Sequence, residues 1–374
     1  YWGPTLVFSN VYAFIPLFFL AILKISKNPS PLQNNYFFAR IARFCKGGGW
    51  WLFGSLVSCL GIITGLINIV FYAFIVGFAW ALYLDWPKSF SKTLRGYVFI
   101  SFTGAILASI WLLPVFNYLP ETLRDETVSS PIFYDYLKIG DILRFFYPFI
   151  QLPGFSGFTL LSGVANLYIG FLPLILAIVA LFLVRRNKMI GFWVALFIFA
   201  FSMRLWFFPI FQWTQLLPIF NRFKGPFHWY SFAFFSLSVL SAYGLDYISE
   251  IKNSRWFKKF IKFLEIFVVL NILTAIVINL TIKFFRLDIL DIAFRYFDKN
   301  IYSATKKYPI DYYHGIITQV FDKSAATFSF SNYQFLISFI FILIGTTLFI
   351  LYYHGLISFE KFKMAAVGIT ILNL

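Results

Sequence analysis

Charged residues are scarce in this 374-residue chain, at 12% of the sequence, whereas soluble domains carry about 25%. This shortage, together with a mean hydropathy of +0.79, excludes an ordinary soluble enzyme or binding domain. Apolar runs recur along the whole length, and each is long enough to cross a hydrocarbon core of about 30 Å. The composition therefore predicts an all-α fold, a polytopic transmembrane helical bundle.

Cysteine and histidine are also rare. Cys45 falls in a basic loop and Cys59 inside an apolar run, so a disulfide between them is not expected. The three histidines, His228, His314 and His354, lack the spacing of metal ligands. No resident cofactor is evident from these residues, although a divalent cation bound together with a substrate stays open.

Apolar segments divide the chain 1–374 into a single helical domain of about nine or ten spans. The run 50–84 is too long for one crossing, and Gly61, Gly65 and Asn68 near its middle predict a hairpin of two short helices. The expected spans are 5–23, 50–66, 68–84, 97–118, 166–184, 189–208, 227–246, 264–285, 334–353 and one that starts near 364.

Charge orients these spans. With the hairpin in place, the basic loops all fall on one side, which the positive-inside rule makes cytoplasmic. Two long segments, 119–165 and 286–333, then lie outside. The net charge of +16 resides mainly in short loops between spans, which argues against a nucleic-acid partner. The loops predicted to share the cytoplasmic side are 24–49, 85–96, 185–188, 247–263 and 354–363.

Two amphipathic segments are expected to lie at the membrane surface as interfacial helices. In 286–300, Leu287, Leu290 and Phe294 can share one face, and Asp291 and Arg295 form an i,i+4 pair. The basic segment 254–263 is similar and is expected on the cytoplasmic face, where it would meet anionic membrane lipids. Both segments can also be read as solvated helix faces.

The short outer loop 209–226 opposes the charge rule, because it contains Arg222 and Lys224 but no acid. Such cations indicate an anionic ligand at head-group height. We therefore expect Arg222, Lys224, the nearby His228 and Arg124 to bind the phosphate of a lipid donor. Trp213 and Trp229 would then hold the loop at the membrane interface.

Carboxylates are absent from the middle of every predicted span, which weighs against an ion-coupled transporter. They concentrate instead in the outer segment 119–165, where Glu121, Asp125 and Asp141 are candidate catalytic bases. Glycosyl transfer from a lipid phosphate needs a carboxylate to deprotonate the acceptor hydroxyl. It also needs cations to stabilise the phosphate that leaves, and this outer side carries both.

Four stretches between about residues 95 and 250 resemble, in order and spacing, the bacterial YfhO membrane proteins of the GT-C class of polytopic glycosyltransferases. The resemblance implies an outer-leaflet transferase in the bacterial plasma membrane. Its expected partners are a polyprenyl-phosphate-linked sugar and a cell-envelope polymer acceptor. The four stretches read ILASIWLLPVFNYLPETLR, LYIGFLPLILAIVALFLVRR, LLPIFNRFKGPFHWYSFAFF and LSAYGLDYI.

The chain departs from that family pattern in two ways. More residues separate Arg222 from Pro226 than the family pattern has. Nothing matches the aspartate that the class holds in its first outer loop, so the chain, which starts at Tyr1, is expected to be a fragment whose catalytic base lies upstream. Two alternatives stay open, namely a transporter or lipid flippase and a non-catalytic scaffold protein.

Overall fold

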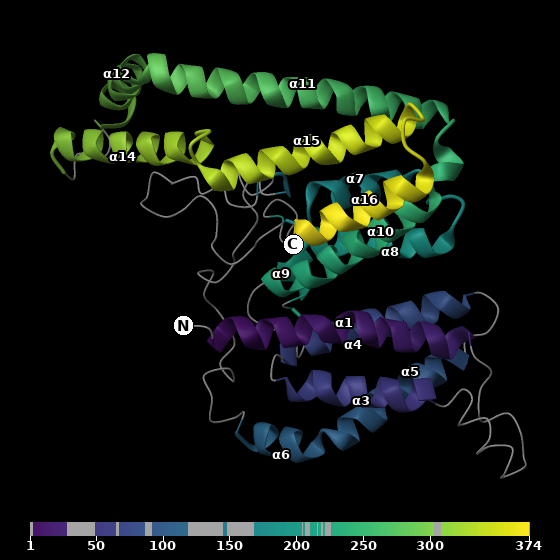
Figure 1. Ribbon diagram of the computed structural model, residues 1–374. Coiled ribbons are helices and arrows are strands. Elements are labelled where there is room, and N and C mark those ends of the chain that lie inside the picture. The colour runs from purple at the N-terminus through teal and green to yellow at the C-terminus, as the bar shows by residue number, and fades with distance from the viewer. Residues whose placement is uncertain are drawn as a thin grey trace, which may run out of the picture. The chain divides into compact units, whose positions relative to one another are not determined.

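A computed structural model shows a chain built from helices (Figure 1). All elements of regular secondary structure within the described residues are helical, which confirms the predicted all-α class. The residues described are 3–27, 49–64, 67–86, 92–118, 145–147, 168–203, 205, 210–214, 216–217, 220, 226–302 and 308–373.

Each of the predicted spans contains a helix among the residues that the structure describes. The longer apolar helices are α1 (Gly3–Lys27), α3 (Gly49–Ile63), α4 (Ile67–Asp85), α5 (Lys92–Leu107), α6 (Ser109–Tyr118), α7 (Phe171–Leu181), α8 (Lys188–Ser202), α10 (Tyr230–Ile251), α11 (Arg255–Phe284), α15 (Tyr333–Tyr353) and α16 (Phe359–Leu372). The remaining elements are α9 (Ile210–Thr214), η6 (Pro226–Trp229), α12 (Arg286–Phe297), η7 (Asp298–Tyr302) and α14 (Ile310–Phe328).

Four helices among the described residues, in α4, α10, α11 and α15, are long and apolar enough to cross a membrane. These helices identify a membrane protein. The predicted span 97–118 is not one straight helix, because α5 and α6 are bent by 72° at Ala108, and this pair makes a fifth candidate span. Gly104 and Pro114 flank the bend, and both residue types weaken helical continuity. The apolar helices α3, α7 and α8 are shorter.

The chain folds into two compact units, which are described separately. Unit 1 comprises Tyr1–Asp135 and Ala195–Phe235, and unit 2 comprises Tyr136–Val194 and Ser236–Leu374.

In unit 1, α1 and α3 run antiparallel. Phe14 in the middle of α1 lies against Gly61 near the end of α3, where an added Cβ would come 2.6 Å from the Phe14 ring. At the other end of the pair, the Lys24 ammonium lies 5.5 Å from the centroid of the Trp50 ring. The end of α1 therefore meets the start of α3, and glycine allows the close approach between them.

Helix α5 runs parallel to α3, because Gly54 contacts Ile100 and Gly104 contacts Ser58 one turn further along both helices. Helix α4 runs antiparallel to α5. The two are joined by hydrogen bonds from the Thr93 backbone N–H and hydroxyl to the Asp85 carboxylate, at 2.7 and 2.6 Å. The end of α4 therefore meets the start of α5.

These directions confirm the hairpin predicted for 50–84. Helices α3 and α4 are separate and run in opposite directions, so Trp50 and Leu84 belong to the same end of unit 1. The predicted loops 24–49 and 85–96 begin and end on helices at that end. One continuous helix over the same residues would have moved every later loop to the other side.

In unit 2, α7 and α10 run parallel and touch through their backbones. The Ser241 hydroxyl donates to the Pro173 carbonyl oxygen at 2.6 Å. One turn further on, Gly244 lies so close to α7 that an added Cβ would overlap the Leu176 carbonyl oxygen, at 1.9 Å. Only glycine fits that position, because it has no Cβ.

Ring contacts set the directions of the other helices in unit 2. Helix α11 is antiparallel to both α7 and α15, and α16 is antiparallel to α15, as Figure 1 shows for α11 and α15. For α7 with α11, the contacts that define the direction are Phe171–Phe267 and Phe182–Phe260. For α11 with α15, they are the ring pair Phe257–Tyr353 and the apolar cluster of Ala275 with Phe335. For α15 with α16, they are Phe349–Phe362 and Tyr352–Phe359.

One end of unit 2, named here the basic end, thus collects the ends of α7, α10 and α15 and the starts of α11 and α16. This arrangement confirms that the predicted loops 185–188, 247–263 and 354–363 share a side. Two carboxylates at this end are near cations. Asp246 lies 3.5 Å from the Lys363 ammonium, and Glu265 lies 3.6 Å from the His354 imidazole.

The prediction for 247–263 was wrong in one respect. Helix α11 begins at Arg255 rather than near 264, after the side chain of Ser254 accepts a hydrogen bond from the Phe257 N–H at 3.1 Å. The basic segment is therefore the first part of a long helix and not a separate interfacial helix, and only a short turn joins α10 to α11.

At the opposite end of α11, helices α12 and α14 fold together (Figure 1). Leu290, Phe297 and Ile317 form the core between them. The predicted pair of Asp291 with Arg295 is present. Of the predicted apolar face, Leu290 and Phe294 pack against α14, whereas Leu287 is 75% exposed, and contact of this face with the membrane surface stays a prediction.

An asparagine fixes the turn that follows α14. Within α11, the Asn279 amide donates to the carbonyl oxygens of Ala275 at 2.9 Å and Phe328 at 3.1 Å. Its carbonyl oxygen accepts from the Phe330 N–H at 3.1 Å. A polar side chain inside an apolar helix thus has its hydrogen bonds supplied by the turn between α14 and α15.

Candidate functional site

Most of the side chains predicted to form the site lie outside the described residues, so their convergence stays a prediction. Among the predicted site residues, only His228 is described. The residues outside the description are Glu121, Arg124, Asp125, Asp141, Arg222 and Lys224.

His228 belongs to η6, directly before α10, and its side chain is buried, at 5% exposure. The next residue, Trp229, is 2% exposed and packs on Tyr72 at 4.5 Å and on Phe199 at 5.2 Å between ring centroids. The expectation that Trp229 anchors the loop at the interface is therefore wrong. Trp213, at 58% exposed, is available for that role. The contact of His228 with a donor phosphate stays a prediction.

A piece of the predicted outer segment 119–165 packs among the helices of unit 2. The Tyr147 hydroxyl donates to the Asn271 side-chain oxygen on α11 at 2.8 Å, and its ring stacks on Phe335 of α15 at 5.2 Å. Phe146 contacts Phe171 at the start of α7, at 6.1 Å between ring centroids. The outer position predicted for the whole segment stays a prediction, because residues 145–147 are the part of it that the structure describes.

The start of α7 is also tied to the end of α16. The Tyr168 hydroxyl donates to the Asn373 side-chain oxygen at 2.7 Å. Between them lies Gly170 with φ of 95°, a left-handed conformation that favours glycine. A Cβ at Gly170 would come within 2.5 Å of the Asn373 amide nitrogen. These contacts fix the loop before α7 against α16, at the end of unit 2 opposite the basic end.

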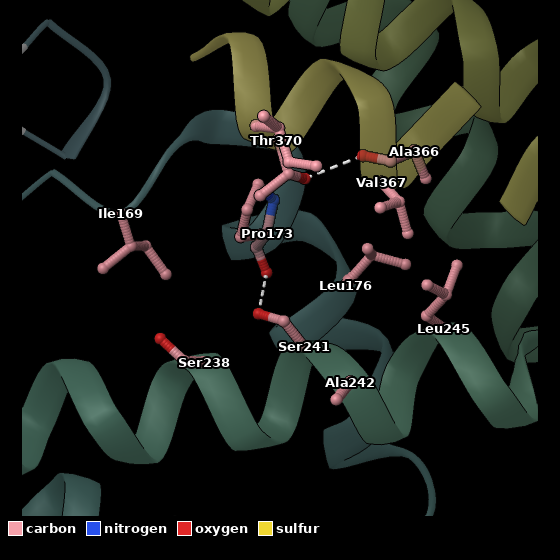
Figure 2. Close-up of a pocket in the computed structure, with 11 residues that line it drawn as sticks. Ile169, Pro173, Leu176, Ser238, Ser241, Ala242, Leu245, Ala366, Val367 and Thr370 are labelled. Atoms are coloured by element: carbon pink, nitrogen blue, oxygen red, sulfur yellow. Dashed lines mark hydrogen bonds between the residues drawn. The ribbon is translucent and has the colours of Figure 1, made fainter. Parts of the chain in front are cut away.

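An open pocket of about 260 Å³ lies among α7, α10 and α16 (Figure 2), and Ile169 and Thr370, close to this junction in the sequence, help to line it. Two hydroxyls on its wall are turned to backbone carbonyl oxygens, that of Ser241 to Pro173 and that of Thr370 to Ala366. Such a surface suits a hydrocarbon chain better than a sugar. The lining residues are Ile169, Pro173, Leu176, Ser238, Ser241, Ala242, Leu245, Ala366, Val367, Thr370 and Ile371.

Metal-binding and thiol chemistry gain no support from the described part of the chain. There, His, Cys, Asp and Glu side chains form no group of three or more that could hold a metal ion. Cys59 is a free thiol within α3. No family model matches this chain, and neither the curated proteins nor the solved structures include a match.

Proposed function

We propose that this membrane protein is a glycosyltransferase of the YfhO type within the GT-C class. It would move a sugar from a polyprenyl-phosphate donor to a cell-envelope acceptor at the outer leaflet of the bacterial plasma membrane. Arg124, Arg222 and Lys224 would bind the phosphate, with Asp141 or another outer carboxylate near the acceptor.

One observation carries this proposal. Helix α10 ends at Ile251 in the basic end of unit 2, and its 22 residues correspond to about 33 Å at 1.5 Å per residue. Its first residue, Tyr230, is therefore about a bilayer core away from the basic end. Arg222 and Lys224 lie shortly before Tyr230 in the sequence. The positive-inside rule accounts for cations at the basic end, but it does not account for cations at this opposite end of the helix.

Two further features fit a lipid-linked donor. The pocket among α7, α10 and α16 is apolar and open on the side where Val367 and Ile371 are exposed, so it can take part of an isoprenoid chain. The segment near Tyr147 packs into unit 2, and Asp141 lies a few residues before it in the sequence. This proximity in the sequence favours Asp141 as the carboxylate near the acceptor.

The test compares two arginine variants of the full-length protein. Arg222→Ala should lower the transfer of labelled sugar from undecaprenyl-phosphate donors by at least tenfold, about 1.4 kcal/mol, at normal expression. Arg295→Ala removes the same charge from an exposed position on α12 and should leave transfer unchanged. Equal transfer by Arg222→Ala and the wild type would refute the phosphate-site assignment.

The same preparations distinguish a flippase. In proteoliposomes, a transferase converts the labelled donor to product only when acceptor is added. A flippase moves intact donor between leaflets without acceptor. Donor movement without sugar transfer would replace the proposed reaction with lipid transport.

A further inference from the structure

Helix α11 is longer than a membrane crossing requires. Its 30 residues correspond to about 45 Å, whereas a hydrocarbon core is about 30 Å thick. The average tilt of about 20° absorbs only a small part of this difference. The excess lies at the basic end, because the first ten residues contain Arg255, Lys258, Lys259 and Lys262, and the apolar residues follow.

The exposed residues of α11 form one continuous face. At about 100° per residue, the four basic residues and the exposed apolar residues fall within one sector of about 160°. The apolar part of the helix is only 17% buried, so this sector is a surface that the hydrocarbon of a bilayer can cover. Its exposed apolar residues are Trp256, Phe263, Ile266, Val269, Leu270, Leu273, Ile276, Val277, Leu280 and Phe284.

The basic residues of this face have no counter-charge within the described structure. Arg255, Lys258, Lys259 and Lys262 form no ion pair with another described residue, and Lys259 lies 5.6 Å from the ring of the exposed Trp256. Four acids among the described residues lie at the same end. Asp246 lies near Lys363 and Glu265 lies near His354. The other two, Glu250 and Glu360, form no ion pair with the four cations.

A second element adds cations beside this face. Phe182, at the end of α7, contacts Phe260 of α11 at 6.1 Å between ring centroids. Arg185 and Arg186 follow in the turn after α7, and both are exposed. Positive charge from two elements therefore gathers next to the first turns of α11.

We infer that the start of α11 binds the head groups of anionic phospholipids from the leaflet at the basic end. A lipid whose acyl chains cover the apolar part of the face brings its phosphate to the height of Lys258, Lys259 and Lys262. Arg255 and Trp256 lie further out in the head-group layer. The continuity of basic and apolar surface identifies a membrane lipid rather than a soluble anion as the occupant.

The experiment measures lipid binding to the full-length protein in detergent by native mass spectrometry. The variant is Lys258→Gln/Lys259→Gln/Lys262→Gln. The matched control, Lys283→Gln/Lys299→Gln/Lys323→Gln, removes three exposed lysines from the opposite end of α11 and from the elements that follow it. The probes are phosphatidylglycerol, cardiolipin and the zwitterionic phosphatidylcholine, each at several salt concentrations.

Each lysine should contribute about fivefold to binding of the anionic lipids, and the triple variant should lose on the order of 100-fold. The control variant and phosphatidylcholine binding should change by less than about threefold. Equal loss in both triple variants would refute the site, as would unchanged phosphatidylglycerol binding in the first. Displacement of bound phosphatidylglycerol by an equal concentration of inorganic phosphate would overturn the lipid assignment.

A second measurement covers the case in which the triple variant does not fold. Binding of phosphatidylglycerol to the wild-type protein should weaken as salt rises, because the charges are exposed and screened. Phosphatidylcholine binding should not. The same salt response for both lipids would contradict a head-group site.

Discussion

Replacing Gly244 with alanine tests the contact between α7 and α10 most directly. An added Cβ would lie 1.9 Å from the Leu176 carbonyl oxygen and 2.7 Å from its carbonyl carbon, and neither backbone atom can rotate away. Restoring an ordinary contact requires roughly 1.5 Å of separation between the helices. That shift lengthens the 2.6 Å bond from Ser241 to Pro173 beyond hydrogen-bonding distance.

The expected loss of stability follows from these two effects. Overpacking a close contact costs about 1–3 kcal/mol, and the broken hydrogen bond contributes about 0.5–1.5 kcal/mol. The total of about 2–4 kcal/mol should lower the Tm of the purified protein by about 3–5 °C. Size-exclusion chromatography of heated samples in detergent measures that shift.

The control is Gly368→Ala in α16, where an added Cβ meets no atom within 4 Å. Alanine favours a helix over glycine by up to about 1 kcal/mol, so its Tm should stay equal or rise slightly. A double variant sharpens the test. Gly244→Ala is expected to break the Ser241 hydrogen bond by itself. Adding Ser241→Ala to the Gly244→Ala variant should therefore lower the Tm less than adding Ser241→Ala to the wild type. Equal Tm values for the two glycine variants would refute the reasoning.

Two further predictions concern the turn after α14 and the topology. The three hydrogen bonds of the Asn279 side chain are named here the Asn279 clamp. Asn279→Leu removes them and should make the turn between α14 and α15 more sensitive to protease. Unchanged cleavage would contradict the role of this clamp in holding the turn. In a background without Cys45 and Cys59, an impermeant thiol reagent on intact cells should label Tyr296→Cys and not Trp256→Cys. Equal labelling would show that the two ends of α11 are not on opposite sides.

The positions of the helices could be predicted because hydropathy and charge report directly on membrane crossing. The hairpin over 50–84 followed from the length of the run, the residues near its middle and the charge of the loops, and the opposite directions of α3 and α4 confirm it. The early start of α11 could not be predicted this way. A hydropathy criterion leaves the lysines and arginine at 255–262 out of the predicted span. These residue types are nevertheless good helix formers, and Ser254 caps helix α11 before them.

The candidate site was less accessible to sequence reasoning. Charge pattern identified Arg222 and Lys224, but the interior position of Trp229 depends on Tyr72, which lies far away in the sequence. Aromatic residues suit both the membrane interface and a core, and the local sequence does not distinguish them. The docking of Tyr147 onto Asn271 likewise joins residues 124 positions apart, which no local pattern indicates.

The Asn279 clamp has a consequence for the order of synthesis. Its partners Phe328 and Phe330 lie 49 and 51 residues later in the chain. At 5–20 residues per second, the ribosome needs about 3–10 s to make that stretch. During that interval the Asn279 side chain has only the Ala275 carbonyl oxygen of its own helix. The nascent α11 is therefore made with an incompletely bonded amide, whose hydrogen bonds are completed only when the turn between α14 and α15 has been synthesised.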